Sequence, residues 1–214
     1  MGDAASHSGV PLGIQAGDKR SVDTAQWHEL AAGLERILAR GAVRAQPEDT
    51  APYECDGLTL YRERPAVVAL PETEEQVAQI LRLCHRLRVP VVPRGAGTGL
   101  SGGALPHKDG LLLSLARLDR IVAVDARART ATVQTGVTNL AISDAARPHG
   151  LFYAPDPSSQ IACTIGGNVA ENSGGVHCLK YGMTLQNLLR VRGFLCDGET
   201  VEIGAVGAEA PGLD

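Results

Sequence analysis

Two glycine-rich loops carry the residues whose types and spacing could bind an anionic group. The first runs from Pro93 to Gly103, reads PRGAGTGLSGG and follows a short apolar run. Its glycines permit positive φ and remove side chains, so consecutive backbone N–H groups can converge on an anion. A pyrophosphate suits such a loop, because it offers several acceptor oxygens and requires close approach of the backbone. The hydroxyls of Thr98 and Ser101 could add donors.

Two familiar nucleotide motifs do not explain this loop. A Walker A loop ends in Gly-Lys-Ser/Thr, whereas Gly102 is followed by glycine and alanine. The spacing GxGxxG is present from Gly97 to Gly102, with Asp119 about twenty residues further on, but this fingerprint must open a helix. Residues 103–110 contain a proline and end in glycine, which predicts no helix. We expect loop backbone alone to hold the phosphates; a tight connection without a ligand is the alternative.

The second glycine group follows the sequence PDPSS at 155–159. It reads TIGGNVAENSGG over residues 164–175, and its small residues alternate with amides. Such a stretch suits a flat, hydrogen-bonding ring system that lies against backbone. The alternative is a polar surface loop, which seldom holds four glycines with apolar residues between them.

Four nearby side chains have a structural interpretation beside a chemical one. Asp156 could bind a hydroxyl of a ligand or fix its own turn. His177 has no evident partner, which favours a structural role over a catalytic one, and Cys163 is expected to be a small buried hydrophobe. Glu171 stands among apolar residues and is expected to pair with a backbone amide. No pair of carboxylates and no His/Ser/Asp set indicates hydrolysis.

Composition narrows the class of protein. The formal net charge is −4, no Lys/Arg cluster offsets it and only 3% of residues are aromatic, which argues against a nucleic-acid partner. No apolar run approaches the roughly 20 residues of a membrane span, and the first twenty residues lack the apolar centre of a signal peptide. The cysteines form no Cys-x-x-Cys pair, which favours reduced thiols in a cytoplasmic protein over disulfides or a zinc site. They are Cys55, Cys84, Cys163, Cys178 and Cys196.

The order of the elements predicts a mixed α/β chain in three parts: a disordered tail over 1–20, a helix and an extended segment over 21–65, and the main domain over 66–214. A strand–helix–strand unit at its start implies that its two strands pair parallel with a right-handed crossover. Thr73 and Gln76 form a capping-box signature for the helix of that unit. We expect helices over 24–38, 73–87 and 138–147, strands over 66–70, 89–93 and 111–115, hairpins over 121–135 and 188–203, and irregular chain over 44–65 and 154–182.

The two loops together resemble the FAD-binding domain of the vanillyl-alcohol oxidase / p-cresol methylhydroxylase family. The sequences PYECDG from Pro52, DPSS from Asp156, NVAEN from Asn168 and CLKYG from Cys178 narrow the resemblance. They are similar to the branch that holds D-lactate dehydrogenases and the FAD-binding subunits of bacterial glycolate oxidases. The resemblance covers residues 25–214.

The resemblance implies an α+β fold of two subdomains: a small parallel βαβ subdomain and a mixed or antiparallel sheet with helices, truncated at the C-terminus. FAD would be the cofactor, and no metal is implied within these residues. The first loop lacks a histidine that could attach the flavin, so we expect non-covalent FAD. The resemblance places the pyrophosphate on Arg94, Gly95, Ala96, Gly97, Thr98, Gly99, Leu100 and Ser101. It places the flavin and ribityl groups on Pro157, Ser158, Gly166, Gly167, Asn172 and Gly175, with Tyr181 and Gly182 nearby.

The resemblance also implies an activity for a longer protein. That protein would oxidise a 2-hydroxy acid such as glycolate or D-lactate to the 2-oxo acid, with hydride passing to flavin N5. Its partners would be a second flavin subunit and an iron–sulfur subunit, in the cytoplasm or at the inner membrane surface. Relatives carry substrate-binding arginines and catalytic histidines in a later cap domain, so no catalytic residue is assigned here and the fragment alone is expected to be inactive. A non-catalytic flavin-binding or interaction module is the alternative function.

Overall fold

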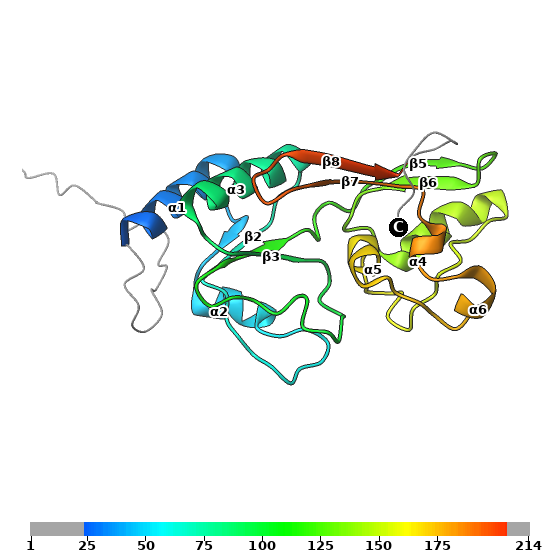
Figure 1. Ribbon diagram of the computed structural model, residues 1–214, viewed down its shortest axis with the longest axis horizontal. Coiled ribbons are helices and arrows are strands. Elements are labelled where there is room, and N and C mark those ends of the chain that lie inside the picture. Colours follow the sequence, from blue (N-terminus) through cyan, green and yellow to red (C-terminus); the bar gives the residue numbers. More distant parts are fainter. Residues whose placement is uncertain (1–23, 205–214) are drawn as a thin grey trace, which may run out of the picture.

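A four-stranded sheet under two helices forms the first of two lobes (Figure 1). The computed structural model describes residues 24–204; the expected tail over 1–20 and the last ten residues lie outside that range. The strands are β1 (Val43–Arg44), β2 (Val67–Ala69), β3 (Val91–Arg94) and β4 (Leu111–Ser114), in the spatial order β1-β2-β4-β3. β1 is antiparallel to β2, and the other two pairings are parallel.

The expected strand–helix–strand unit is present, but its two strands are not neighbours. β4 lies between β2 and β3 and pairs with both. All four residues of β4 are buried, as a central parallel strand requires. β3 carries Pro93, which cannot donate to a ladder, and therefore suits the edge of the sheet.

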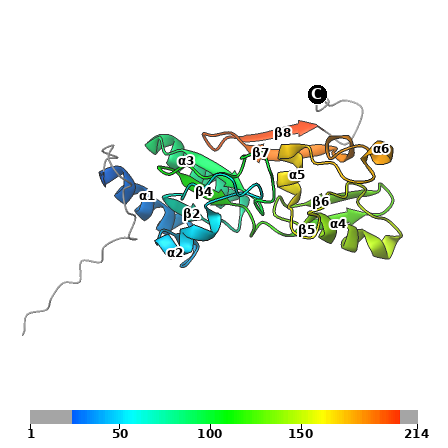
Figure 2. The ribbon, with the colours of Figure 1, turned by 90° about the horizontal axis from the view of Figure 1, so that it is seen from below.

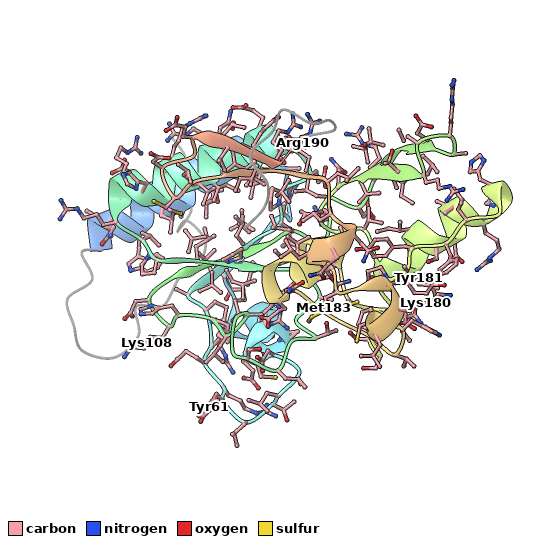
Figure 3. All side chains as sticks on the ribbon, turned by 45° about the vertical axis from the view of Figure 1, so that its right-hand side comes forward. Tyr61, Lys108, Lys180, Tyr181, Met183 and Arg190 are labelled. Atoms are coloured by element: carbon pink, nitrogen blue, oxygen red, sulfur yellow. The ribbon has the colours of Figure 1, made fainter. Side chains whose placement is uncertain are left out.

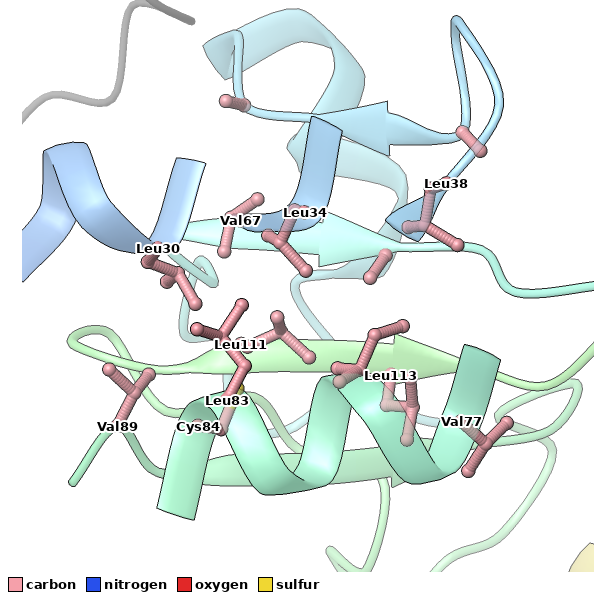
Figure 4. Packing of buried hydrophobic residues seen from close by; sticks show 14 of the residues in the cluster. Leu30, Leu34, Leu38, Val67, Val77, Leu83, Cys84, Val89, Leu111 and Leu113 are labelled. Atoms are coloured by element: carbon pink, nitrogen blue, oxygen red, sulfur yellow. The ribbon is translucent and has the colours of Figure 1, made fainter. Parts of the chain in front are cut away.

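Helices α1 (Thr24–Ile37) and α3 (Glu74–Leu87) pack against this sheet and enclose the main core, which Figure 4 shows from close by. The capping box at the start of α3 is formed in both directions, as expected. Burial raises the pKa of the Cys84 thiol to about 12, so this cysteine acts as a core residue. The fully buried side chains of the cluster include Leu30, Leu34, Val67, Ile80, Leu111 and Cys84.

The segment after β1 is less irregular than its sequence indicates. It forms a short helix α2 (Pro47–Thr50) and a turn of 3-10 helix η1 (Ala51–Tyr53). Each of these begins with a proline in its first turn, where the missing N–H costs nothing. The chain then runs through an extended stretch to β2.

The second lobe contains a hairpin and several short helices. Strands β5 (Ile121–Asp125) and β6 (Thr130–Val133) pair antiparallel, as expected. Helix α4 (Asn139–Ala146) follows, capped by Thr138, and η2 (Arg147–His149) ends at Gly150.

The segment 154–182, expected to be irregular, contains two further helices. They are α5 (Ile165–Glu171) and α6 (Cys178–Tyr181), and η3 (Leu185–Asn187) follows. Two glycines hide α5 from a propensity argument. It forms because tertiary bonds hold its start: the N–H groups of Ile165 and Gly166 donate to the carbonyls of Val137 and Thr135.

The last hairpin joins the two lobes. It comprises β7 (Arg190–Phe194) and β8 (Thr200–Gly204) and reaches back over α3, as Figures 1 and 2 show. Phe194 packs against the first core and Arg192 pairs with Glu74. No helix within residues 24–204 is long and apolar enough to cross a membrane.

Candidate cofactor-binding site

The loop after β3 presents a run of free backbone donors. Among the described residues, none of the N–H groups from Ala96 to Ser101 donates to a protein acceptor. Gly97 and Gly102 have φ of 72° and 80°, which turns the backbone as an anion-binding concavity requires. No helix follows Gly102, which confirms that the GxGxxG spacing is not a dinucleotide fingerprint.

Arg94 lies beneath this loop and supports it. Its Nη1 donates to the carbonyls of Cys55 at 2.8 Å, Ala104 at 3.3 Å and Tyr53 at 3.4 Å. Burial lowers the pKa of the guanidinium, and the neighbouring Cys55, Tyr53 and Asp56 act in the opposite direction. A Cβ on Gly97 would lie 2.2 Å from Arg94 Nη2, so the loop can cross the guanidinium only at a glycine. The Arg94 side chain therefore shapes the loop through backbone carbonyls.

The segment 53–58 braces the loop from outside. Asp56 is 6% exposed, and its carboxylate accepts from Gly102 N at 2.8 Å and Leu58 N at 3.0 Å. Gly57 N donates to Gly99 O at 2.9 Å, and a Cβ on Gly57 would lie 2.6 Å from Thr98 O. Neither Asp56 nor Gly57 was among the expected site residues; the Asp-Gly pair was the available signal.

The start of α5 packs directly against the first loop. A Cβ on Gly95 would lie 2.1 Å from Thr164 Oγ1, and one on Gly166 would lie 1.7 Å from Thr135 Oγ1. Both glycines are therefore required for close packing. Thr164 is 5% exposed, yet its Oγ1 has no hydrogen-bond partner among the residues that the structure describes. A buried hydroxyl without a partner next to a run of free N–H groups indicates a place where a polar ligand completes the structure.

Two buried amides hold the second loop in place. Asn139 Nδ2 donates to Pro155 O, and Asn168 Nδ2 donates to Asn139 Oδ1, each at 2.9 Å. Asn139 is fully buried and Asn168 is 2% exposed. The pair connects α4, α5 and the Pro155–Pro157 turn, and neither residue was among the expected site residues.

Asp156 and His177 form a pair, which corrects the expectation that His177 has no partner. His177 Nδ1 lies 2.5 Å from Asp156 Oδ2, and its backbone N–H donates to Oδ1 at 3.2 Å. The backbone N–H of His177 is the main cause that lowers the pKa of Asp156. The Asp156 carboxylate thus fixes the turn, and a Cβ on Gly175 would lie 2.2 Å from its Oδ1.

The remaining expected site residues lie around α6. Asn172 ends α5 in the left-handed conformation, and its Oδ1 accepts from Leu185 N at 3.0 Å. Gly182 ends α6 with φ of 78°. Figure 3 shows Lys180 and Tyr181 close together at this end of the second lobe, where the Lys180 ammonium lies 4.9 Å from the centre of the Tyr181 ring. In the turn before α5, Pro157 is buried and Ser158 is exposed.

Glu171 meets the first loop, which corrects its expected pairing with a backbone amide. Its Oε2 accepts from Ser101 Oγ at 2.8 Å across 70 residues of sequence. The structure therefore brings the first loop and α5 together at two points: Gly95 against Thr164, and Ser101 with Glu171.

Comparison with known proteins decides what this arrangement is. Residues 65–204 match the family described as FAD binding domain. The chain belongs to this family. It is 61% identical over 167 residues to glycolate oxidase subunit GlcD of Escherichia coli K12, covering 78% of this chain and 34% of that protein. It is 41% identical over 138 residues to a D-lactate dehydrogenase of Archaeoglobus fulgidus, covering 64% of this chain and 31% of that protein.

Solved structures confirm the expected fold of this FAD binding domain. p-Cresol methylhydroxylase superposes with a TM-score of 0.77 at 18% identity, over 95% of this chain and 41% of that one. An alkyldihydroxyacetonephosphate synthase gives a TM-score of 0.75 at 20% identity, over 93% of this chain and 38% of that one. The chain spans about a third of the length of the curated relatives described above.

The residues present fit FAD. The free N–H groups of Ala96–Ser101 offer donors for phosphate oxygens, while glycines at 95, 97 and 166 let backbone segments approach where side chains would collide. The unpartnered Thr164 hydroxyl lies at the junction of the two loops. FAD is therefore the cofactor that both the family and the geometry indicate.

Proposed function

We propose that this chain is the FAD-binding part of a 2-hydroxy acid oxidoreductase that converts glycolate or D-lactate to the 2-oxo acid. Two observations support the proposal: the run of free N–H groups beside the start of α5, and 61% identity to a glycolate oxidase subunit. In this proposal residues 66–214 form the FAD-binding part, and residues 21–65 support it.

Each loop has a distinct task in the proposal. The N–H groups of residues 96–101 hold the pyrophosphate, and Arg94 and Gly95 fix the geometry of that loop from below. The flavin and ribityl groups lie against the second loop and the turn at Pro157. The residues of that second surface are Pro157, Ser158, Gly166, Gly167, Asn172, Gly175, Tyr181 and Gly182. The bound flavin supplies a hydride acceptor.

In this proposal the groups that bind the substrate and accept its proton are not among the residues of this chain. Substrate carboxylate must be gripped by cations that face the flavin. Several cations of the first lobe bind other partners: Arg94 binds backbone carbonyls, Arg86 pairs with Glu29 and Arg117 pairs with Glu72. We place the substrate clamp and the proton acceptor in the two-thirds of the relatives that this chain does not span. Partner subunits with a second flavin and with iron–sulfur clusters, and a cytoplasmic or membrane-peripheral location, belong to the same proposal.

Anaerobic mixing with 2-hydroxy acids tests the function. The longer protein, loaded with FAD, should lose its flavin absorbance near ~450 nm with glycolate or D-lactate, because the flavin is reduced. The 214-residue chain loaded with FAD should keep that absorbance. A longer protein that binds FAD but is reduced by neither acid would contradict the activity and favour a non-catalytic flavin-binding module. Rapid reduction of the 214-residue chain would show that the catalytic groups lie within it.

A further inference from the structure

A single hydrogen bond connects the first glycine loop to the second glycine group. Ser101 Oγ donates to Glu171 Oε2 at 2.8 Å. Within residues 24–204, no other hydrogen bond joins residues 95–103 to residues 154–187. The other contact between them, Gly95 against Thr164, is one of packing.

Glu171 occupies a position that is unfavourable for a carboxylate by itself. It is the last residue of α5, where the helix dipole disfavours negative charge. It forms no ion pair within the described part of the chain. The Ser101 hydroxyl is its hydrogen-bond partner. The contact between the loops therefore offsets the unfavourable interaction of this carboxylate with the helix dipole.

The first loop is open to the Glu171 side chain. Glu171 Oε1 would lie 3.0 Å from a Cβ on Gly103 and 3.7 Å from one on Gly99. The carboxylate thus lies along a stretch of bare backbone on both sides of Ser101. A Cβ at Gly103 would crowd the carboxylate, whereas one at Gly99 would make ordinary van der Waals contact with it.

We propose that Ser101 and Glu171 form a clasp that positions the first loop against α5 and thereby sets the affinity for FAD. The inference rests on the proposed cofactor role of the two loops. Both residues act as positioning residues: they hold the free N–H groups of residues 96–101 at a fixed distance from the flavin-facing loop. Without the clasp, the loop becomes ordered only when FAD binds. The loss of conformational entropy of the loop then makes the free energy of FAD binding less favourable.

A double-mutant cycle tests the clasp. S101A and E171A should each raise the Kd for FAD about fivefold, as the loss of one exposed hydrogen bond to a charged group does. The double variant should show about the same fivefold rise, because the two residues act through one contact. E171Q keeps an acceptor and S101T keeps a donor, so both should bind FAD within about twofold of wild type. D144A removes an exposed carboxylate of α4 and is the control that should leave the Kd unchanged.

A second readout separates the clasp from FAD binding itself. In the chain without FAD, S101A and E171A should speed amide hydrogen exchange at Gly102, whose N–H donates to Asp56 Oδ2, by about fivefold, and D144A should not. Additive effects in the cycle, or E171Q as weak as E171A, would overturn the clasp. If the wild-type chain bound no FAD, the proposed function would fail for this chain. Exchange at Gly102 would still decide the clasp, because a rate unchanged in both variants would overturn it.

Discussion

Gly97 meets two independent demands at one residue. Its φ of 72° lies in the region that favours glycine, and the Arg94 guanidinium lies where its Cβ would be. Glycine spacing alone predicts that Gly97 belongs to a phosphate loop. That spacing could not reveal the guanidinium beneath, because the carbonyls that orient Arg94 come from segments near residues 53–55 and 104.

Substitution of Gly97 should therefore abolish FAD binding. Gly97→Val adds a branched side chain at positive φ and forces it into Arg94, so the loop must move away from its anion-binding shape. We expect the Kd for FAD to rise at least about 100-fold, equivalent to about 2.7 kcal/mol. Isothermal titration calorimetry or a titration followed by flavin fluorescence measures the Kd directly.

Gly150 provides a control for the effect of positive φ in this variant. It has φ of 68°, but no atom lies within 4 Å of the position that a Cβ would take, so Gly150→Ala imposes the backbone strain without the collision. Gly150→Ala should lose about 1 kcal/mol of stability and bind FAD as wild type does. A Gly97→Val protein with wild-type affinity would show that the loop does not hold phosphate.

Asp156 gives a residue-scale prediction about pH. The His177 backbone N–H lowers its pKa in the folded chain, so the folded state favours the charged carboxylate. The resulting stability is fully present above the ordinary aspartate pKa of about 3.9 and is lost as pH falls through the lowered value. Asp156→Asn lacks this contribution. The difference in Tm between wild type and Asp156→Asn should therefore shrink between pH 5 and pH 3; a difference that stays constant would rule out this linkage.

At the scale of elements, α5 depends on contacts that lie far away in sequence. Asn168 of α5 donates a hydrogen bond to Asn139 of α4, and Asn139 donates one to the Pro155 carbonyl. Because both amides are buried, water cannot readily replace these bonds. The helix is therefore as stable as the network that holds it.

Asn139→Ala should consequently destabilise the second lobe strongly. It leaves the Asn168 amide and the Pro155 carbonyl buried without partners, which costs about 3 kcal/mol. Urea unfolding followed by circular dichroism measures the change. Asn187→Ala is the comparison, because it removes the hydrogen bonds that Asn187 Nδ2 donates to two carbonyls in a more exposed turn. It should lower the free energy of unfolding by less. An equal or smaller loss for Asn139→Ala would contradict the role of the buried network.

The elements that local signals specify were predictable. The capping box at Thr73, the cap at Thr138 and both hairpins depend on residues close in sequence, and all are present. The elements that depend on partners distant in sequence were not predictable. β4 enters between β2 and β3 because its Leu111–Leu113 run is buried on both sides, and α5 forms despite Gly166 and Gly167.

The candidate site shows the same division. Glycine density located both loops, but the residues that shape them, Asp56, Asn139 and Thr164, are recognised only from contacts across the chain. The partners of His177 and Glu171 were missed for the same reason, since Asp156 and Ser101 lie 21 and 70 residues away. The glycines alone indicate where a loop lies, whereas the contacts that support the loop are known only from the fold.

At the scale of the whole molecule, the last hairpin follows the second lobe in the chain and packs back onto the first. Phe194 enters the core of the first lobe, and Arg82 Nη2 donates to Gly198 O at 3.3 Å. The two glycine-rich loops contact each other where these lobes meet, at Gly95 with Thr164 and at Ser101 with Glu171. FAD binding should therefore stabilise the whole chain, and Tm should rise with FAD concentration.

The visible spectrum of the purified protein before and after acid precipitation tests the central claim most directly. We expect flavin bands near ~450 nm in the folded protein. Since no histidine lies within the loop of residues 95–103, all of that colour should pass to the supernatant as free FAD. Colour that remains with the precipitate would contradict non-covalent attachment. A protein that neither carries flavin nor takes up added FAD would contradict the assignment of these loops as its binding site.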